Sequence, residues 1–302
     1  MPTQHEIRNT ITQKIVDAVK NGTPPWRKPW SNIPDPVRFP TNIASGNAYR
    51  GINNLLLQLE ANEKSYPVGY WATYRQMLAL GQQVRRGERS TQVVYYKQLK
   101  KTRLNDSGKK ETTTFPLLKT WNVFNLSQTD GPLSDKYLTP SGPVFAASGD
   151  HREFFDVVFA TGADVRYGGN RAAYIHPPHD LIQIPHRDQF EDFSAFADTL
   201  GHEITHWSGG NGKLRLARDL AYAQEELVAE IGAAFLLQAT GVPHPHLDNS
   251  ASYVSSWLKA IEGDGAKFIF KAASLASDAV DYILKFSDSS SETQPELVAS
   301  QV

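Results

Sequence analysis

The 302-residue sequence contains no cysteine and only 2 methionines. Without cysteine the protein forms no disulfide and offers no thiolate to a metal, so histidine and carboxylate are the remaining metal ligands. No apolar run approaches the roughly 20 residues that cross a membrane, so no membrane partner is expected. The first residues are polar, which argues against a signal peptide. These absences together predict a cytoplasmic protein.

Charge is distributed unevenly along the chain. Residues 1–130 carry 19 Lys+Arg against 9 Asp+Glu, whereas the remainder carries 12 against 23, and the whole chain has a net charge of −1. The length is sufficient for two domains, each with its own core. A basic half joined to an acidic half predicts that only the first half binds a polyanion.

A short stretch of the acidic half has the pattern of a metal site. His202 and His206 are four residues apart, so on a helix both imidazoles lie on one face, one turn apart. Glu203 lies about 100° around that helix, where its carboxylate can take a proton from a water at the metal. The apolar spacing upstream predicts the helix, and the glycine pair predicts its end: Phe193, Phe196, Leu200 and Ile204, then Gly209 and Gly210.

The third ligand is expected from the next helix, which is predicted to begin near Arg218. Two histidines and a glutamate leave the fourth position of a tetrahedral Zn²⁺ ion open, as catalytic zinc requires. Glu226 is the favoured third ligand and Glu225 the alternative, while Glu230 is placed to orient a ligand histidine. A solvated acidic helix face is the competing interpretation, and the upstream histidine pair favours the metal.

This half resembles the gluzincin metallopeptidases in its His-Glu-x-x-His run followed by Glu226, with Glu230 in place of their aspartate. The resemblance implies a zinc metalloprotease-like site. It also implies that an edge strand, here Leu181–Ile184 of two short strands expected between residues 174 and 185, pairs with extended substrate. No clear counterpart exists for the residue that stabilises the tetrahedral intermediate in those enzymes, and the candidates are Tyr222, His176 and His179.

The basic half is predicted to be an α+β unit. Apolar residues at four-residue steps predict a helix over residues 3–20. The remaining expectations are a short helix at 55–59, a helix at 70–80, a basic turn at 85–89, and strands at 91–97 and 115–124 that form a hairpin around a lysine-rich excursion at 99–114.

Aromatic residues are interleaved with cations in this half, most densely in the proline-stiffened loop at 23–30. Its tryptophans either pack on a core or offer faces on which bases stack. Cations that follow phosphates and aromatic faces that stack bases are typical of single-stranded DNA binding, and duplex-reading motifs are absent. The candidate DNA-binding residues are Trp26, Arg27, Lys28, Trp30, Tyr49, Arg50, Arg85, Arg86, Arg89, Lys100 and Lys101.

Separated motifs carry a closer resemblance, and they are Pro25–Trp30, Tyr49–Asn53, Tyr70-Trp71, Val84–Glu88 and Trp121–Asn125, together with the His202 and Glu225 motifs. Over roughly residues 5–285 the chain resembles ArdC-type antirestriction proteins, whose N-terminal domain is shared with plasmid-encoded primases of conjugation. The resemblance implies single-stranded DNA binding and protection of incoming DNA from host restriction.

We therefore expect two α+β domains. Residues 1–130 form the basic single-stranded-DNA-binding domain, 131–150 a linker, 151–286 a gluzincin-like metallopeptidase domain, and 287–302 a disordered tail. Two alternatives to the antirestriction function remain open. One is a zinc metallopeptidase that DNA only targets to a host protein substrate, and the other is a DNA-coating protein with a structural metal.

Overall fold

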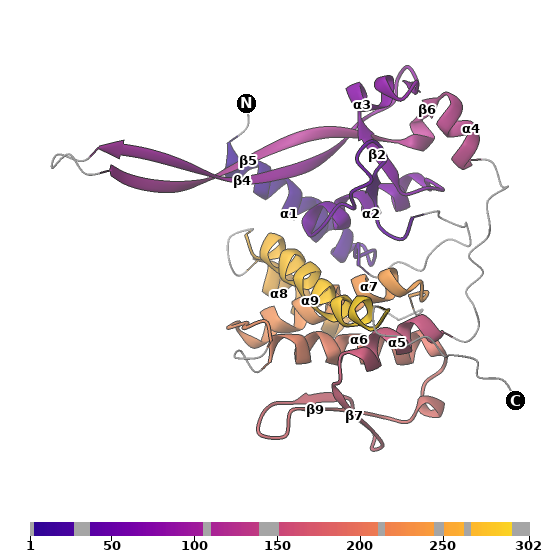
Figure 1. The fold of residues 1–302 in the computed structure, drawn as a ribbon, viewed down its shortest axis with the longest axis vertical. Helices are drawn as coiled ribbons and strands as arrows, with labels where there is room; N and C mark the ends of the chain where they lie inside the picture. Colours follow the sequence, from indigo (N-terminus) through magenta and orange to yellow (C-terminus); the bar gives the residue numbers. More distant parts are fainter. Residues whose placement is uncertain are drawn as a thin grey trace, which may run out of the picture. The chain divides into compact units, whose positions relative to one another are not determined.

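The computed structural model describes residues 3–26, 37–104, 110–138, 151–210, 215–244, 251–262 and 267–291. Internal contacts divide them into two compact units (Figure 1). The first holds residues 3–25, 37–138 and Lys267, and the second holds Trp26 and the rest. Both units combine helices with a sheet, which confirms the expected fold class of two α+β domains.

A four-stranded sheet with the order β1-β2-β5-β4 organises the first unit. Strand β1 is parallel to β2, and the other neighbours are antiparallel. The bounds are β1 Thr41–Asn42, β2 Tyr70–Thr73, β4 Thr91–Leu104 and β5 Lys110–Asn125. The helices are α1 Gln4–Lys20, α2 Ile52–Lys64 and α3 Tyr74–Ala79, and α1 begins with a Thr3–Glu6 capping box.

Apolar clusters lie on both faces of this sheet, because successive residues of a strand point to opposite sides. Val123 belongs to one cluster, with Leu57, Trp71 and Val93. Its neighbour Phe124 packs against the other cluster, whose buried members are Val68, Ala72, Met77, Val84 and Leu126. The sheet is therefore covered on two sides near its base.

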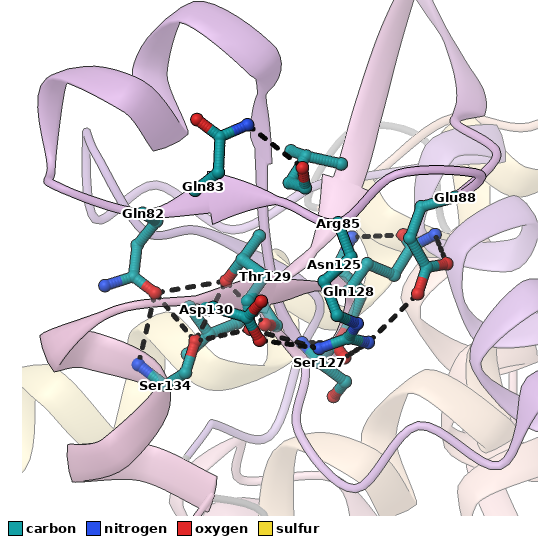
Figure 2. Close-up of polar contacts among 12 residues, drawn as sticks. Gln82, Gln83, Arg85, Glu88, Asn125, Ser127, Gln128, Thr129, Asp130 and Ser134 are labelled. Carbon is teal, nitrogen blue, oxygen red and sulfur yellow. Dashed lines mark hydrogen bonds and ion pairs between the residues drawn. The ribbon is translucent and has the colours of Figure 1, made fainter.

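Polar contacts, here called the polar joint, connect the last elements of the first unit to residues 82–88 (Figure 2). The side-chain oxygen Oε1 of Gln82 accepts hydrogen bonds from the hydroxyls of Thr129 at 3.1 Å and Ser134 at 2.7 Å. Arg85 donates to Glu88 and Asp130. The elements involved are β3 Gln83–Val84, η1 Leu126–Gln128, β6 Thr129–Asp130 and α4 Pro132–Leu138. Part of the stretch that we expected as linker thus packs on the first unit.

Two expectations for the first unit were wrong. The helix expected at 70–80 is strand β2 followed by α3, because the Thr73 side chain accepts a hydrogen bond from the Gln76 amide and starts a helix only there. The excursion expected at 99–114 is mostly paired, since the ladder of β4 and β5 continues to Leu104 and Lys110. Its β-branched threonines favour strand.

The second unit contains a three-stranded sheet in which β9 is central. Strand β7, Asp164–Tyr167, is parallel to β9, Leu181–Ile184, and β8, Ala173–Ile175, is antiparallel to it. The expectation that Leu181–Ile184 forms an edge was therefore wrong, because both of its sides are already paired. Strand β8 is one of the two edges.

Five helices of the second unit lie within the described residues: α5 Arg152–Ala160, α6 Phe193–Gly209, α7 Tyr222–Thr240, α8 Ala251–Glu262 and α9 Phe268–Ser291. A short 3₁₀ turn, η2 Arg187–Gln189, precedes α6. Residues 287–291 of the expected tail continue α9, and the rest lies outside the described residues. Among the described helices, none has both the length and the apolarity needed to cross a bilayer.

Glycines allow α6 and α7 to approach closely. A Cβ on Gly232 of α7 would lie 2.5 Å from the Thr205 methyl of α6, and one on Gly201 would lie 3.4 Å from Ala233. This contact places the middle of α6, which carries the histidine pair, against the middle of α7.

Candidate metal centre and DNA-binding residues

Two helices supply the predicted metal ligands. Helix α6 starts at Asp192, whose side chain accepts a hydrogen bond from the Ala195 amide at 2.8 Å, and it ends at the predicted glycine pair. His202 and His206 lie one turn apart on α6, and Glu226 lies in the first turns of α7.

The three side chains converge on one point. The Nε2 atoms of His202 and His206 are 3.0 Å apart, and each lies 3.5 Å from a carboxylate oxygen of Glu226. All three ligand atoms lie within 4.8 Å of one another. Two imidazoles and a carboxylate suit a divalent transition-metal ion and leave a coordination position for water or substrate. The residues therefore fit the ion that the sequence pattern suggests.

The other imidazole nitrogens also face carboxylates. His206 Nδ1 lies 3.3 Å from Glu225 Oε1, and His202 Nδ1 lies 3.8 Å from Glu230 Oε1. Such carboxylates fix the tautomer and the orientation of a ligand histidine. The geometry favours Glu226 over Glu225 as the third ligand, because Glu225 meets the nitrogen that points away from the convergence point.

Arg218 holds Glu225 in this position. Its side chain is only 2% exposed and donates to both Glu225 oxygens, at 2.7 and 3.1 Å. It also donates to the Thr205 carbonyl at 2.5 Å and to the Ser208 hydroxyl at 3.1 Å, both on α6. A Cβ on Gly209 would collide with the guanidinium, so this glycine makes room for it. Sequence reasoning missed Arg218, for which the only signal was an arginine between the two ligand helices.

The electrostatics of the centre favour a cation. Burial alone would lower the pKa of His206, but Glu225 and Glu226 raise it to about 9. Burial would raise the pKa of Glu226, whereas His202 and His206 lower it well below its usual range. In the absence of a metal the carboxylates thus hold a proton on a histidine, and a metal ion would take over that positive charge.

Glu203, the predicted general base, is 8% exposed. Its Oε2 accepts a hydrogen bond from the Tyr174 amide of edge strand β8 at 2.7 Å. Tyr174 is itself anchored, because its hydroxyl donates to Asp180 at 2.7 Å and Arg215 donates to both groups. Burial and Asp180 raise the pKa of Tyr174 to about 12. The β8 backbone therefore positions the carboxylate.

The three candidates for stabilising a tetrahedral intermediate lie in exposed positions. Tyr222 is 80% exposed at the start of α7. His176 and His179 are exposed in the turn after β8, and the His176 ring packs edge-on against Tyr174 at 4.7 Å. Among the described residues, neither His176 nor His179 hydrogen-bonds or ion-pairs with His202, His206 or Glu226.

The candidate DNA-binding residues have different surroundings. Trp26 is 2% exposed and its ring meets Trp257 edge-on at 5.6 Å, so the packing alternative applies to it. Arg85 is engaged in the polar joint, and Tyr49 is half-buried. Arg50, Arg86 and Arg89 are exposed. The backbone of Lys100 and Lys101 lies in β4, and Arg27, Lys28 and Trp30 lie outside the described residues.

Family models match both halves of the chain. One described as the N-terminal domain of anti-restriction factor ArdC matches residues 5–124, and one described as a zincin-like metallopeptidase matches residues 153–275. The resemblance that the sequence motifs suggested is thereby confirmed.

Relatives and solved structures extend the match. The uncharacterized protein y4eC of Sinorhizobium fredii is 34% identical over 93% of this chain and 92% of its own length. Two DNA primases TraC of Escherichia coli are 34% and 35% identical, but the match spans only 20% and 27% of their lengths. The metal-free crystal structure of antirestriction protein ArdC from plasmid R388 is 38% identical with a TM-score of 0.74, covering 94% of this chain and 98% of that one. Its Mn(II)-bound structure is 39% identical with a TM-score of 0.71 and covers 93% and 97%.

Proposed function

Since this chain belongs to the ArdC family of antirestriction proteins, we propose that it binds single-stranded DNA and protects incoming DNA from host restriction during conjugation. The observation that carries the proposal is the match to R388 ArdC across both units, over 94% of this chain. The TraC primases support a DNA-directed role for the same region, although this chain spans about a quarter or less of their length.

DNA binding is assigned to the first unit. Its sequence carries the positive charge excess, and neutralising phosphates releases counterions from the DNA. Arg50, Arg86 and Arg89 are exposed, as phosphate contacts require. The acidic second unit would repel the same polyanion.

The second unit is proposed to hold one Zn²⁺ through His202, His206 and Glu226, with Glu225 and Glu230 orienting the histidines. The Mn(II)-bound structure of R388 ArdC supports the binding of a divalent ion by this family. When bound, such an ion polarises a carbonyl and lowers the pKa of water.

Peptide hydrolysis is a second candidate function of this unit. Glu203, buried and fixed through one oxygen by the Tyr174 amide, could accept a proton from an attacking water through its other oxygen. A host protein would be the substrate. We rank hydrolysis below protection, because Tyr222, His176 and His179, the predicted stabilising residues, all lie in exposed positions.

A transfer assay tests the ranking. Recipient cells with and without a restriction system receive a plasmid that carries its recognition sites, together with wild-type protein or Glu203→Ala at matched levels. Wild-type protein should raise transfer only into the restricting host. Glu203→Ala should protect equally, because the substitution leaves the metal ligands and the first unit intact.

Absence of protection by wild-type protein would refute the antirestriction proposal. Loss of protection in Glu203→Ala, with metal content and DNA binding retained, would show that protection requires hydrolysis. A general base typically contributes 10²–10⁴-fold in rate, so that outcome would be unambiguous.

A further inference from the structure

Exposed aromatic side chains lie on the β4–β5 hairpin, and two of them share a face. Trp121 is 56% exposed and Tyr95 is 48% exposed. Neither side chain makes a hydrogen bond or ring contact with the part of the chain that the structure describes. A tryptophan exposed to this extent is uncommon, and exposed aromatic residues outside a core are typical of binding surfaces.

The strand register places these rings on the same face. Trp121 lies opposite Val93, and Tyr95 lies opposite Lys119, two residues further along each strand. Cross-strand partners share a face, and so do residues two apart, which puts Trp121, Tyr95 and Lys119 on one side. We call these three residues the aromatic hairpin face.

This face continues a buried cluster at the base of the hairpin. Val93 and Val123 lie on the same side and are 5% and 1% exposed, packed with Leu57 and Trp71. Tyr49, a predicted DNA contact, packs against that cluster. The face is therefore buried at Val93 and Val123 and exposed at Trp121 and Tyr95. The exposed rings are carried by strands that the neighbouring core holds in place.

The edge of β4 is already occupied at the adjoining position. The Asn53 side chain accepts a hydrogen bond from the Val94 amide and donates one to its carbonyl, each at 2.8 Å. An added strand cannot pair with β4 at that residue. Next to Val93 and Tyr95, the side chains of the face therefore offer themselves to a ligand where the strand edge does not.

We propose that the aromatic hairpin face binds single-stranded DNA, with bases stacking on Trp121 and Tyr95 and a phosphate paired with Lys119. This inference rests on the proposed function. Stacking needs rings that are accessible and rigidly mounted, and every base offers a π-face. Lys119 is exposed and forms no ion pair among the described residues. An exposed cation beside the rings, in a half of the chain with excess positive charge, favours a polyanion over an apolar protein as the ligand of this face. Bases in a duplex are not accessible for such stacking.

Tyr96 provides a matched control. It is 53% exposed on the same strand, but it is the neighbour of Tyr95 and therefore points to the opposite face. The full-length protein would be titrated against a fluorescein-labelled single-stranded oligothymidylate, followed by anisotropy. Trp121→Ala should weaken binding roughly 5- to 150-fold, the range observed for one stacked base. Trp121→Phe should recover most of it, and Tyr96→Ala should bind like wild type.

Salt dependence separates stacking from charge. Lys119→Gln should reduce the slope of log affinity against log salt by about 0.7, the contribution of one phosphate contact on a single strand. Trp121→Ala should lower the affinity without changing the slope. A folding defect would change the affinity and the salt slope together. Circular dichroism of each variant checks for such a defect.

Equal binding by wild type and Trp121→Ala would overturn the assignment of this face and leave the proposed function standing. Equal loss in Trp121→Ala and Tyr96→Ala would overturn it as well, since a general effect on the hairpin would explain both. Tighter binding of duplex than of single strand would also overturn it. No binding of either nucleic acid by wild-type protein would refute the DNA-binding part of the proposed function.

Discussion

Glu225 and Glu226 are neighbours in sequence, and the same substitution should affect them differently. Glu226 is the carboxylate that approaches both Nε2 atoms, at 3.5 Å, whereas Glu225 contacts His206 Nδ1 at 3.3 Å on the far side of the ring. Glu226→Gln removes the charged ligand and should weaken metal binding more than about 100-fold. Glu225→Gln removes only an orienting partner, which typically costs about 10–100-fold.

Glu225→Gln should also carry a cost in stability. Its carboxylate neutralises Arg218, which is 2% exposed, and an amide retains some of the hydrogen bonds but not the charge. Removing one partner of a buried ion pair costs about 3–5 kcal/mol, and Glu225 is itself 23% exposed, so we expect about 3 kcal/mol or less. Glu226→Gln leaves Arg218 paired and should be the milder change in the metal-free protein.

Competition with a chromophoric chelator for Zn²⁺ gives the affinities, and metal analysis after dialysis gives the stoichiometry. Urea unfolding of the metal-free variants gives the stability. Glu191→Gln, an exposed glutamate of the same unit, controls for the loss of one negative charge. Full metal content in Glu226→Gln with none in Glu225→Gln would reverse the ligand assignment.

Two further predictions concern the scaffold of the centre. Gly232→Ala would place a Cβ 2.5 Å from the Thr205 methyl, which should cost about 1–3 kcal/mol in urea unfolding and weaken metal binding, whereas Gly201→Ala, at 3.4 Å from Ala233, should be milder. Asp180→Asn should cost about 2 kcal/mol at neutral pH. Burial would raise the pKa of Asp180, but Arg215 and Tyr174 lower it below the usual 3.8, so the difference from wild type should disappear as the pH falls below that value. A difference that persists in acid would contradict the ion-pair explanation.

The juxtaposition of His202 and His206 could be predicted from the sequence because helix geometry alone relates them. Residues four apart on α6 share a face whatever surrounds the helix, so the histidine pair needed no tertiary information. The choice between Glu225 and Glu226 did need it, since it depends on how α7 is rotated against α6. Arg218, which lies in the connection between the two helices, could not be placed from spacing.

The strand order of the second unit could not be predicted from the sequence, for a different reason. Leu181–Ile184 is apolar and its pattern predicts a strand, but whether a strand is central depends on its neighbours. Strand β7 is mostly exposed and lacks the alternation that marks a strand from sequence, so it was not expected. Its pairing with β9 makes β8 an edge, and the amide by which β8 holds Glu203 follows from that arrangement.

Aromatic residues show most directly what a sequence leaves open. The loop around Trp26 contains two cations, and its composition therefore predicted a DNA contact. In the structure Trp26 is instead only 2% exposed and packs against Trp257. Trp121, in a strand where aromatic residues usually pack inward, is 56% exposed. Residue type and neighbouring charge do not distinguish the two tryptophans. What distinguishes them is whether another element packs over the ring, as Trp257 does on Trp26. Val93 is covered by Leu57 of α2, and its cross-strand partner Trp121 is not. A candidate stacking surface can therefore be identified from strand register: it lies where an aromatic residue pairs with a buried residue but is not itself covered by the core.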